Sequence, residues 1–381
     1  MQNPLCTIGI IGGGQLGRMM IYRAKKLGFR FAVLDEEGAP AESLADVFIK
    51  GSLKDGRALE ELALISDLMT YEIEHINTGA LEGLREKGRA MHPSPAVLRI
   101  IQDKLLQKEL FAQNDIPAAA FFSVDDPAAA DFSKRKFPLV QKARRDGYDG
   151  RGVRVLQSAA DTPLPVPSVF EDMVDIDREL AVMAARGPGG SLAVYPVVEM
   201  AFNPEHNICD TVIAPARIDE KTAAAAREIA VRVLTALDGV GVFGVELFLD
   251  RQGRVLLNEI APRPHNSGHY TMEACVTCQF EQHIRAVAGL PLGDASLLRP
   301  AVMVNLLGQP DSAGRPVIEG LAEALKVSGL SLHLYAKREV RPFRKMGHFT
   351  VTAATQAEAI EKAEYARSIL KIHGSGKRGI T

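Results

Sequence analysis

The feature that most constrains the fold is a glycine-rich turn between two short apolar runs near the start of the chain. Residues 5–11 are apolar and β-branched, which is typical of a buried parallel strand. The glycine-rich turn, residues 12–17, follows at once. Residues 18–27 then have helical spacing, and residues 31–34 form a second apolar strand that ends at Asp35. This order predicts a βαβ unit and therefore a Rossmann-like domain with a parallel sheet.

The glycine-rich turn alone leaves the ligand open. Gly12, Gly14 and Gly17 match the G-x-G-x-x-G pattern, and Asp35 stands where a dinucleotide-binding domain places its ribose-binding acid. An NAD-dependent oxidoreductase is therefore one hypothesis. Glycines, however, let the backbone approach any phosphate at a helix N-terminus, or simply form a tight turn. The amide of Gln15 favours a hydrogen bond to a sugar or phosphate instead.

Composition narrows the class of protein. At about 150 residues per domain, the 381 residues predict two or three domains, and the hydrophobic fraction of 46% is ordinary for a globular protein. The net charge of −2 argues against a generally cationic nucleic-acid binder. Four cysteines do not make a disulfide scaffold. We see neither a leader sequence nor an apolar run long enough to span a membrane, so we expect a cytoplasmic protein without membrane contact.

Strands and helices alternate irregularly after the first domain, which should close near residues 93–95. A Pro-rich surface connection is expected at residues 161–167, and a small β-rich module after about residue 300. We predict strands at residues 67–71, 137–142, 153–156, 169–174, 179–185, 242–249 and 254–260. We predict helices at residues 102–113, 222–237 and 356–370.

A second glycine-rich segment, between residues 144 and 152, indicates triphosphate binding. A loop of this kind can fold over phosphates with its backbone N–H groups and Arg side chains, and Lys142 precedes it on a strand. Residues 171–174 have the form of a hinge that reads an adenine edge, and Glu179 could accept hydrogen bonds from ribose hydroxyls. The candidate ATP contacts are Lys104, Lys142, Gly147, Tyr148, Asp149, Gly150, Arg151, Gly152, Glu171, Asp172, Met173, Val174, Glu179, Asn258 and Glu259.

Two glutamates predict a metal site. Glu246 and Glu259 lie on the two strands of a hairpin that turns at residues 250–253. Cross-strand neighbours stand about 5 Å apart, which is close enough to share one or two Mg²⁺ ions, and Asn258 adds an amide oxygen. The alternative is a solvated acidic pair on an exposed sheet face.

These pieces, in this order, resemble the ATP-grasp ligases, and specifically the 5-carboxyaminoimidazole ribonucleotide synthetase family. The resemblance runs from about Gly9 to His348. Its motifs are GGQLGRM at 13–19, T-x-EIEH at 70–75, DK-x-x-x-K-x-x-F at 103–111, GYDGRG at 147–152, NE-x-APR-x-HNSGH at 258–269, SGHYT-x-EAC with QFEQH at 267–283, and EVRP-x-RKMGH at 339–348.

The resemblance implies a mixed α/β and α+β fold with four parts. These are a Rossmann-like N-terminal domain (1–95), a small lid domain with the Gly-rich loop (96–175), a large domain with the metal site (176–300) and a C-terminal β-rich module (301–375). It also implies a homodimer, and a hand-off of product to the mutase that uses it.

The activity that the resemblance implies is ATP-dependent carboxylation of aminoimidazole ribonucleotide with bicarbonate, through carboxyphosphate. Arg263 would clamp bicarbonate or carboxyphosphate. His265 would orient bicarbonate or handle a proton, unless it is an ordinary polar loop histidine. Asp149 would bind the amino group of the nucleotide. The remaining substrate contacts would be Gln15, Leu16, Glu74, Asn266 and a cationic set suited to the 5-phosphate, Lys337, Arg344 and Lys345, whose alternative is a solvated basic loop.

Three other interpretations stay open at this point. They are another ATP-grasp enzyme such as formate-dependent glycinamide ribonucleotide transformylase, an NAD-dependent oxidoreductase, and a catalytically dead nucleotide-binding module. One departure from the family pattern is the C-x-x-C formed by Cys275 and Cys278. Because zinc needs about four ligands, we expect packed helical thiols there.

Overall fold

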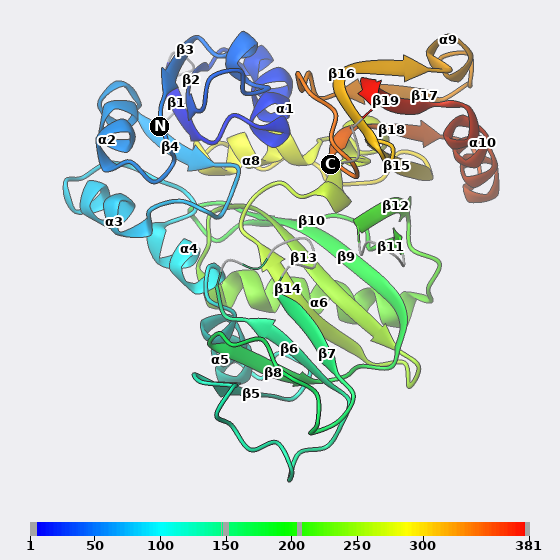
Figure 1. Cartoon of the computed structure of the whole chain (residues 1–381). Coiled ribbons are helices and arrows are strands. Elements are labelled where there is room, and N and C mark those ends of the chain that lie inside the picture. The colour runs from blue at the N-terminus through cyan, green and yellow to red at the C-terminus, as the bar shows by residue number, and fades with distance from the viewer. Residues whose placement is uncertain (1–5, 146, 148–151, 204–207, 378–381) are drawn as a thin grey trace.

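The computed structural model describes residues 6–145, 147, 152–203 and 208–377. Within these residues, no helix is long and apolar enough to cross a membrane. The chain forms an N-terminal parallel sheet, a small antiparallel sheet and a large central sheet, to which the C-terminal residues add further strands (Figure 1).

The N-terminal sheet has four parallel strands in the order β3-β2-β1-β4. Its elements are β1 (Thr7–Ile11), α1 (Gln15–Ala24), η1 (Lys25–Leu27), β2 (Arg30–Asp35), η2 (Glu42–Leu44), β3 (Val47–Lys50), α2 (Gly56–Ile65), β4 (Leu68–Tyr71), α3 (Thr78–Glu86) and α4 (Pro95–Ile101). Apolar side chains on one face pack against α1 and α8 (Gln279–Val287), and those on the other face pack against α2 and α3. The predicted βαβ unit is confirmed.

Side-chain caps explain where several helices begin. Asp55, Asn77 and Ser94 each accept a hydrogen bond from a backbone N–H in the first turn of α2, α3 and α4, respectively, which satisfies a donor that has no partner within the helix. Pro95 at the first position of α4 removes another such donor. We did not predict α4. The helix predicted at 102–113 is α5 (Lys104–Gln113), which begins after the cap Asp103.

The small sheet is antiparallel, in the order β5-β8-β6-β7. Its strands are β5 (Phe121–Val124), β6 (Leu139–Ala143), β7 (Val153–Leu156) and β8 (Ser168–Asp172). Its own apolar core includes Phe132 and Phe170. The Pro-rich residues 161–167 connect β7 to β8, as predicted.

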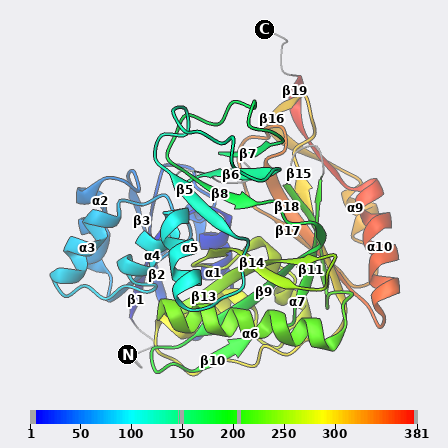
Figure 2. The same cartoon turned by 90° about the horizontal axis from the view of Figure 1, so that it is seen from below.

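The central sheet has nine strands and holds most of the remaining chain. Its strands are β9 (Ile176–Arg186), β10 (Leu192–Val194), β11 (Val198–Asn203), β12 (Ile208–Ala214), β13 (Gly241–Asp250), β14 (Val255–Ala261), β15 (Ala301–Leu307), β17 (Leu330–Leu334) and β18 (Lys345–Thr352). Helix α6 (Glu220–Leu237) packs its apolar face against β9, β13 and β14. Figure 2 shows α6 on one side of these strands and the small sheet on the other.

The strands after residue 300 extend the central sheet. Strand β15 pairs antiparallel with β12, and β18 and β17 follow it. The remaining elements are η3 (Asn266–Gly268), α7 (Thr271–Ala274), β16 (Ser312–Glu319), α9 (Leu321–Ala324), α10 (Gln356–Ile369) and β19 (Lys371–Lys377). Strands β16 and β19 form a separate two-stranded ribbon. Helix α10 covers β15 and β18 in a shared apolar core.

One local prediction is wrong. Cys275 directly follows α7 and Cys278 caps α8, so the two thiols lie between helices and not on one. Both are buried and free, as are Cys6 and Cys209. Cys275 packs into the core of the central sheet, whereas Cys278 packs into that of the N-terminal domain.

Candidate active site

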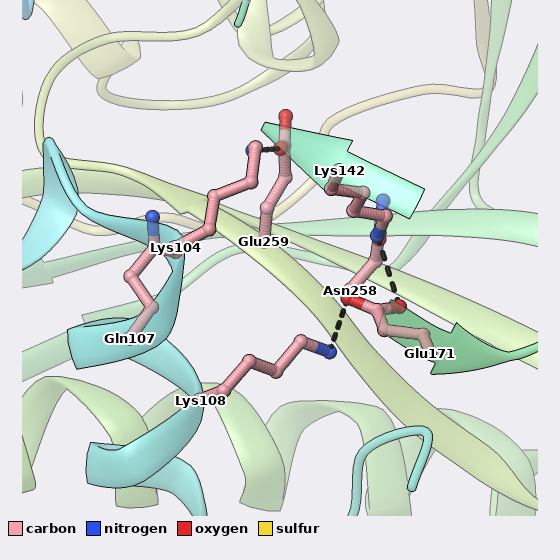
Figure 3. Close-up of a pocket in the computed structure, with 7 residues that line it drawn as sticks. All are labelled: Lys104, Gln107, Lys108, Lys142, Glu171, Asn258 and Glu259. Carbon is pink, nitrogen blue, oxygen red and sulfur yellow. Dashed lines mark hydrogen bonds and ion pairs between the residues drawn. The ribbon is translucent and has the colours of Figure 1, made fainter. Parts of the chain in front are cut away.

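Charged side chains from four elements converge on one small pocket (Figure 3). Lys104 opens α5, Lys142 lies on β6, Glu171 on β8 and Glu259 on β14. The Nζ of Lys104 lies 2.8 Å from Oε2 of Glu259. The Nζ of Lys142 lies 3.0 Å from Oε2 of Glu171 and donates to Oδ1 of Asn258 at 2.9 Å. The candidate phosphate-binding lysines therefore stand beside the candidate metal ligands.

The hairpin β13–β14 places the two glutamates opposite each other. Glu246 and Glu259 are direct Cα partners, and the register shifts immediately after them because Asn258 is an extra residue in β14. A bulge of this kind re-aims side chains next to a site. Glu246 pairs with Ala181 on β9. Glu179 lies two residues before Ala181, and residues two apart on a strand point to the same face. Glu179 therefore lies on the same face of the sheet as Glu246.

The electrostatics of the facing glutamates differ. The enclosed position of Glu246 and the negative charge of Glu259 raise the pKa of Glu246. The Lys104 ammonium lowers the pKa of Glu259. Burial raises the pKa of Glu179 to about 7. Glu246 and Glu259 face each other, and only Glu259 has a strong cationic partner, so a bound cation would favour the charged form of this pair.

His265 and Arg263 follow β14 and face the same region. His265 Nε2 lies 3.4 Å from Oε1 of Glu246, and its Nδ1 lies 2.9 Å from Oγ of Ser267. Burial, together with the charges of Arg263 and Lys345, lowers the pKa of His265 to about 3. The ring is therefore neutral near pH 7. Gly244 is required on β13 because a Cβ there would collide with the His265 side chain.

Arg263 connects this region to the N-terminal domain. Its Nε lies 2.9 Å from Oε1 of Glu74, which follows β4. Glu74 and Arg263 are therefore in contact, although they belong to two parts of the chain that were predicted as separate domains, 1–95 and 176–300. Gln15 is half-buried at the start of α1, and the Leu16 side chain is buried in the N-terminal core, so only the Leu16 backbone is available to a ligand.

Part of the predicted phosphate-binding set is close to this region. Nζ of Lys337 donates to the backbone carbonyl of Lys345 at 2.7 Å, and the charge of Lys345 acts on both Glu246 and His265. Arg344 donates to the carbonyl of Glu339 at 2.9 Å. The amide of Asn266 exchanges two hydrogen bonds with that of Asn305, at 2.9 and 2.7 Å. The Asn266 side chain is therefore buried and paired with Asn305, although it was predicted to contact the substrate.

Part of the Gly-rich loop lies outside the described residues. Those predicted contacts are Tyr148, Asp149, Gly150 and Arg151. Gly147 is described, and Gly152 has a φ of +77°, a conformation that favours glycine. Of the predicted adenine hinge, Glu171 is buried with its backbone paired to β5 and β6, whereas Asp172 and Met173 are exposed and Val174 is half-buried.

The glycine-rich turn at residues 12–17 holds a side chain of the protein itself. The Glu72 carboxylate accepts hydrogen bonds from the backbone N–H groups of Gly14 and Gly17. Asp35 accepts from Gly13 N–H at 2.5 Å. A Cβ at Gly14 would collide with the Glu72 carboxylate. The position that a dinucleotide phosphate would use is thus filled, which argues against the NAD-dependent hypothesis.

Three residues of this region were missing from our predicted set. Lys108 lines the pocket of Figure 3. Asp103 is buried and accepts from Nε and Nη2 of Arg144, at 3.1 and 2.8 Å, which fixes the start of the Gly-rich loop. Glu72 orders the glycine-rich turn. The signal for Lys108 was visible, because Lys104 and Lys108 are four residues apart and share a helix face.

The fold and site define an ATP-grasp protein. Residues 109–280 match the ATP-grasp domain, residues 5–102 the ribonucleotide synthetase preATP-grasp domain, and residues 301–362 the phosphoribosylaminoimidazole carboxylase C-terminal domain. The chain belongs to the N5-carboxyaminoimidazole ribonucleotide synthetase family, as its motifs predicted.

Individual relatives support this assignment. The chain is 40% identical to the N5-carboxyaminoimidazole ribonucleotide synthase of Brucella melitensis, over 91% of this chain and 96% of that protein. The crystal structure of the Thermotoga maritima synthetase has a TM-score of 0.91 and 51% identity, and the match covers 97% of this chain and 100% of that one. The Aspergillus clavatus synthase in complex with ADP and 5-aminoimidazole ribonucleotide has a TM-score of 0.87 and 33% identity, covering 96% and 98%.

Some relatives are longer than this chain. It is 40% identical to the chloroplastic phosphoribosylaminoimidazole carboxylase of Vigna aconitifolia, over 92% of this chain but only 64% of that protein.

Proposed function

We propose that this protein carboxylates 5-aminoimidazole ribonucleotide with bicarbonate, using ATP, and forms 5-carboxyaminoimidazole ribonucleotide, ADP and phosphate in purine biosynthesis. The observation that carries the proposal is the meeting of Lys104, Glu246, Glu259 and His265 at one end of the β13–β14 hairpin. The proposal is supported because an ammonium group, two carboxylates and a neutral imidazole lie together in this arrangement. Family membership supplies the substrate class.

The chemistry balances in two steps. A bicarbonate oxygen attacks the γ-phosphorus, the bond from that phosphorus to the ADP oxygen breaks, and carboxyphosphate forms. The exocyclic amine then attacks the carboxyl carbon, the carbon–oxygen bond to phosphate breaks, and the amine loses a proton. Phosphoryl transfer of this kind depends mainly on positioning and charge neutralisation.

The chain's cations supply that neutralisation. Lys104 and Lys142 would contact the phosphates, and the loop 147–152 would close over them with backbone N–H groups. The backbone of Glu171–Val174 would read the adenine, the Glu179 carboxylate would bind the ribose, and Asn258 would lie beside the phosphates. These assignments are supported by the proximity of Lys104 to Glu259 and of Lys142 to Asn258.

The acidic face fits Mg²⁺. Among the described residues, no group of three or more His, Cys, Asp or Glu side chains could hold a metal alone. Mg²⁺ is usually bound by one or two carboxylates together with substrate phosphates. Glu246 and Glu259 match that requirement, and relief of their mutual repulsion favours a cation there. When bound, Mg²⁺ would neutralise the charge of the triphosphate.

Arg263 and His265 would hold bicarbonate and then carboxyphosphate. A guanidinium binds such planar anions through two N–H groups, and Glu74 orients it at 2.9 Å. The neutral ring of His265 can donate a hydrogen bond or accept a proton at one ring nitrogen. Ser267 and Glu246 fix the ring from both of its nitrogens.

The nucleotide substrate would lie between the glycine-rich turn and the C-terminal strands. Lys337, Arg344 and Lys345 would bind its 5-phosphate, and Gln15, the Leu16 backbone and Glu74 its sugar. Asp149 would contact the amine. The Asn266–Asn305 pair would act by fixing the loop that carries His265.

We also propose the larger organisation that the family implies. This comprises domains at 1–95, 96–175, 176–300 and 301–375, a homodimer in the cytoplasm, and transfer of the product to the mutase that consumes it.

Phosphate release from Mg-ATP tests the proposed function. Release should need both aminoimidazole ribonucleotide and bicarbonate, with one phosphate formed per carboxylated product. Omitting either substrate should lower release to background. Release that instead needs formate and glycinamide ribonucleotide would assign the protein to the transformylase class.

A further inference from the structure

Lys108 is a buried lysine that the proposed reaction leaves without a role. It lies one helical turn after Lys104 on α5, and its side chain is only 4% exposed. Its Nζ lies 3.0 Å from Oε1 of Glu171 and 5.8 Å from the ring centroid of Phe111. Burying an ammonium group is unfavourable unless it is paired. Packing alone therefore does not explain why a lysine occupies this position.

Glu171 is held by two lysines at once. Its Oε1 faces Lys108, whereas its Oε2 lies 3.0 Å from Nζ of Lys142. The two ammonium groups lower the pKa of the Glu171 carboxyl. In Figure 3, Lys108 and Lys142 approach Glu171 from α5 and β6, on different sides of the carboxylate.

The two lysines differ in what else they reach. Lys142 also donates to Asn258, the neighbour of Glu259, and it is the penultimate residue of β6, the strand that leads into the Gly-rich loop. It is therefore directed toward the place proposed for the phosphates. Lys108 lines the same pocket, but its side chain is buried beside Phe111.

When Lys142 turns to the phosphates, Glu171 loses one of its two cations. A buried carboxylate left without a partner is strongly destabilising. If Glu171 had only Lys142, that penalty would oppose nucleotide binding. Lys108 removes the penalty because it stays with Glu171 while Lys142 moves.

We infer that Lys108 is a positioning residue for the nucleotide: it retains the Glu171 carboxylate and so releases Lys142 to the phosphates. This inference rests on the proposed function, in which the pocket binds ATP. It gives Lys108 no contact with the substrate. It predicts that the effect of losing Lys108 depends on the charge of Glu171.

The test measures binding of Mg-ADP and of adenosine to four proteins: the parent, K108M, E171Q and K108M/E171Q. Because the chain contains no Trp, calorimetry for ADP and competition against a labelled ADP for adenosine are suitable. In K108M, Lys142 stays with Glu171, so ADP affinity should fall about tenfold or more, the size of one lost charge-assisted hydrogen bond. Adenosine affinity should change little, since adenosine has no phosphate.

The double variant is the decisive one. In K108M/E171Q, no charge at position 171 holds Lys142, so ADP affinity should return to within a few-fold of the parent. The KM for ATP should follow the same pattern, with a smaller change in kcat. A purely structural role for Lys108 predicts that the double variant is no better than K108M, and this result would overturn the inference. Equal losses for ADP and adenosine in K108M would overturn it as well.

A control variant and a second measurement complete the test. K362M removes a half-buried lysine that is paired with a single glutamate, Glu358, on α10, and it should bind ADP like the parent. If K108M is too unstable to purify, E171Q decides the question alone, because the inference requires that it bind ADP at least as tightly as the parent. Failure of the parent itself to bind ADP would count against the proposed function, not against the role of Lys108.

Discussion

At the scale of single residues, Glu259 joins the proposed metal site to Lys104, a proposed phosphate-binding lysine. Its carboxylate contacts Lys104 at 2.8 Å, and Glu246 stands directly opposite. In E259Q, the amide keeps the shape but loses the charge, so we expect ATP turnover to fall about 100-fold or more. Because the Glu259 side chain is 44% exposed, the free energy of unfolding should change little.

Phosphate release measured over a range of Mg²⁺ concentrations, with urea unfolding alongside, checks this prediction. Turnover equal to that of the parent at limiting Mg²⁺ would show that Glu259 is not a metal ligand. E323Q is a matched control, since it removes the charge of an exposed glutamate of α9 that pairs with Lys326.

The sequence predicted the residues of this site better than their exact placement. Hairpin geometry was enough to bring Glu246 and Glu259 together, because cross-strand partners follow from the turn position. The bulge at Asn258 was not predictable, since it depends on the pairing of the two strands and not on the type of residue at this position. The spacing of Lys108 from Lys104 was visible in the sequence, but its burial was not, because that results from contact with β8, which lies far along the chain.

At the scale of elements, the glycine-rich turn depends on Glu72. Its carboxylate accepts from two backbone N–H groups of the turn, and burial raises the pKa of Glu72 to about 6. In E72Q, the amide nitrogen cannot accept, so one of these hydrogen bonds is lost. We expect the free energy of unfolding to fall by about 1.5–3 kcal/mol.

The same substitution should also raise the KM for aminoimidazole ribonucleotide more than the KM for ATP, because the turn carries Gln15 and Leu16. Urea unfolding and steady-state kinetics with each nucleotide varied separately measure both effects. E60Q is the control: it removes the charge of an exposed glutamate that pairs with Lys87, and it should show neither effect. An E72Q protein as stable as the parent would contradict this role of the carboxylate.

A buried histidine joins the N-terminal sheet to the central sheet. His283 on α8 accepts from Val242 N–H at 3.0 Å through Nδ1, and its Nε2 lies 2.7 Å from Oγ1 of Thr70 on β4. Burial lowers the pKa of His283 to about 3. The folded state therefore binds fewer protons than the unfolded state below about pH 6.5, and the stability that His283 contributes is lost as the pH falls.

H283Q removes this titration. We expect the stability advantage of the parent over H283Q to shrink by up to about 1.4 kcal/mol per pH unit as the pH falls below about 6. Urea unfolding of both proteins at several pH values measures the difference, and taking the difference cancels the opposing contributions of Glu179 and Glu246. A difference that is constant with pH would contradict the prediction.

The elements themselves were predicted unevenly. Long periodic segments such as α6 and the β13–β14 hairpin were found, because their patterns are strong locally. The glycine-rich turn matched a phosphate-binding pattern, yet it holds Glu72, which a local pattern cannot reveal.

At the scale of the whole molecule, one continuous sheet joins the proposed metal site to the C-terminal strands. The pairing of β12 with β15 places β18 in the same sheet as β13 and β14. A β-rich C-terminal module was predictable from the sequence, but this junction was not, because β12 and β15 are far apart along the chain. The charge of Lys345, the first residue of β18, acts on Glu246 and His265.

This arrangement makes Lys345 a test of the substrate-phosphate assignment. The phosphate is far from the reacting amine, so its binding energy mainly positions that amine. K345A should weaken aminoimidazole ribonucleotide binding by about 10- to 150-fold, the loss of one charge-assisted hydrogen bond. ATP affinity should change little, because the proposed triphosphate contacts are Lys104 and Lys142. The effect on aminoimidazole ribonucleotide should shrink at high salt, where the attraction is screened.

Titration of the parent and K345A with each nucleotide separately measures this difference, and K371A, on an exposed position of β19, is the control. Lys337 donates to the backbone carbonyl of Lys345, so that contact is retained in K345A and local structure should persist. Equal loss for both nucleotides would place Lys345 in the ATP site or in the general fold. No loss for either would contradict the phosphate assignment and favour the alternative, a solvated basic set.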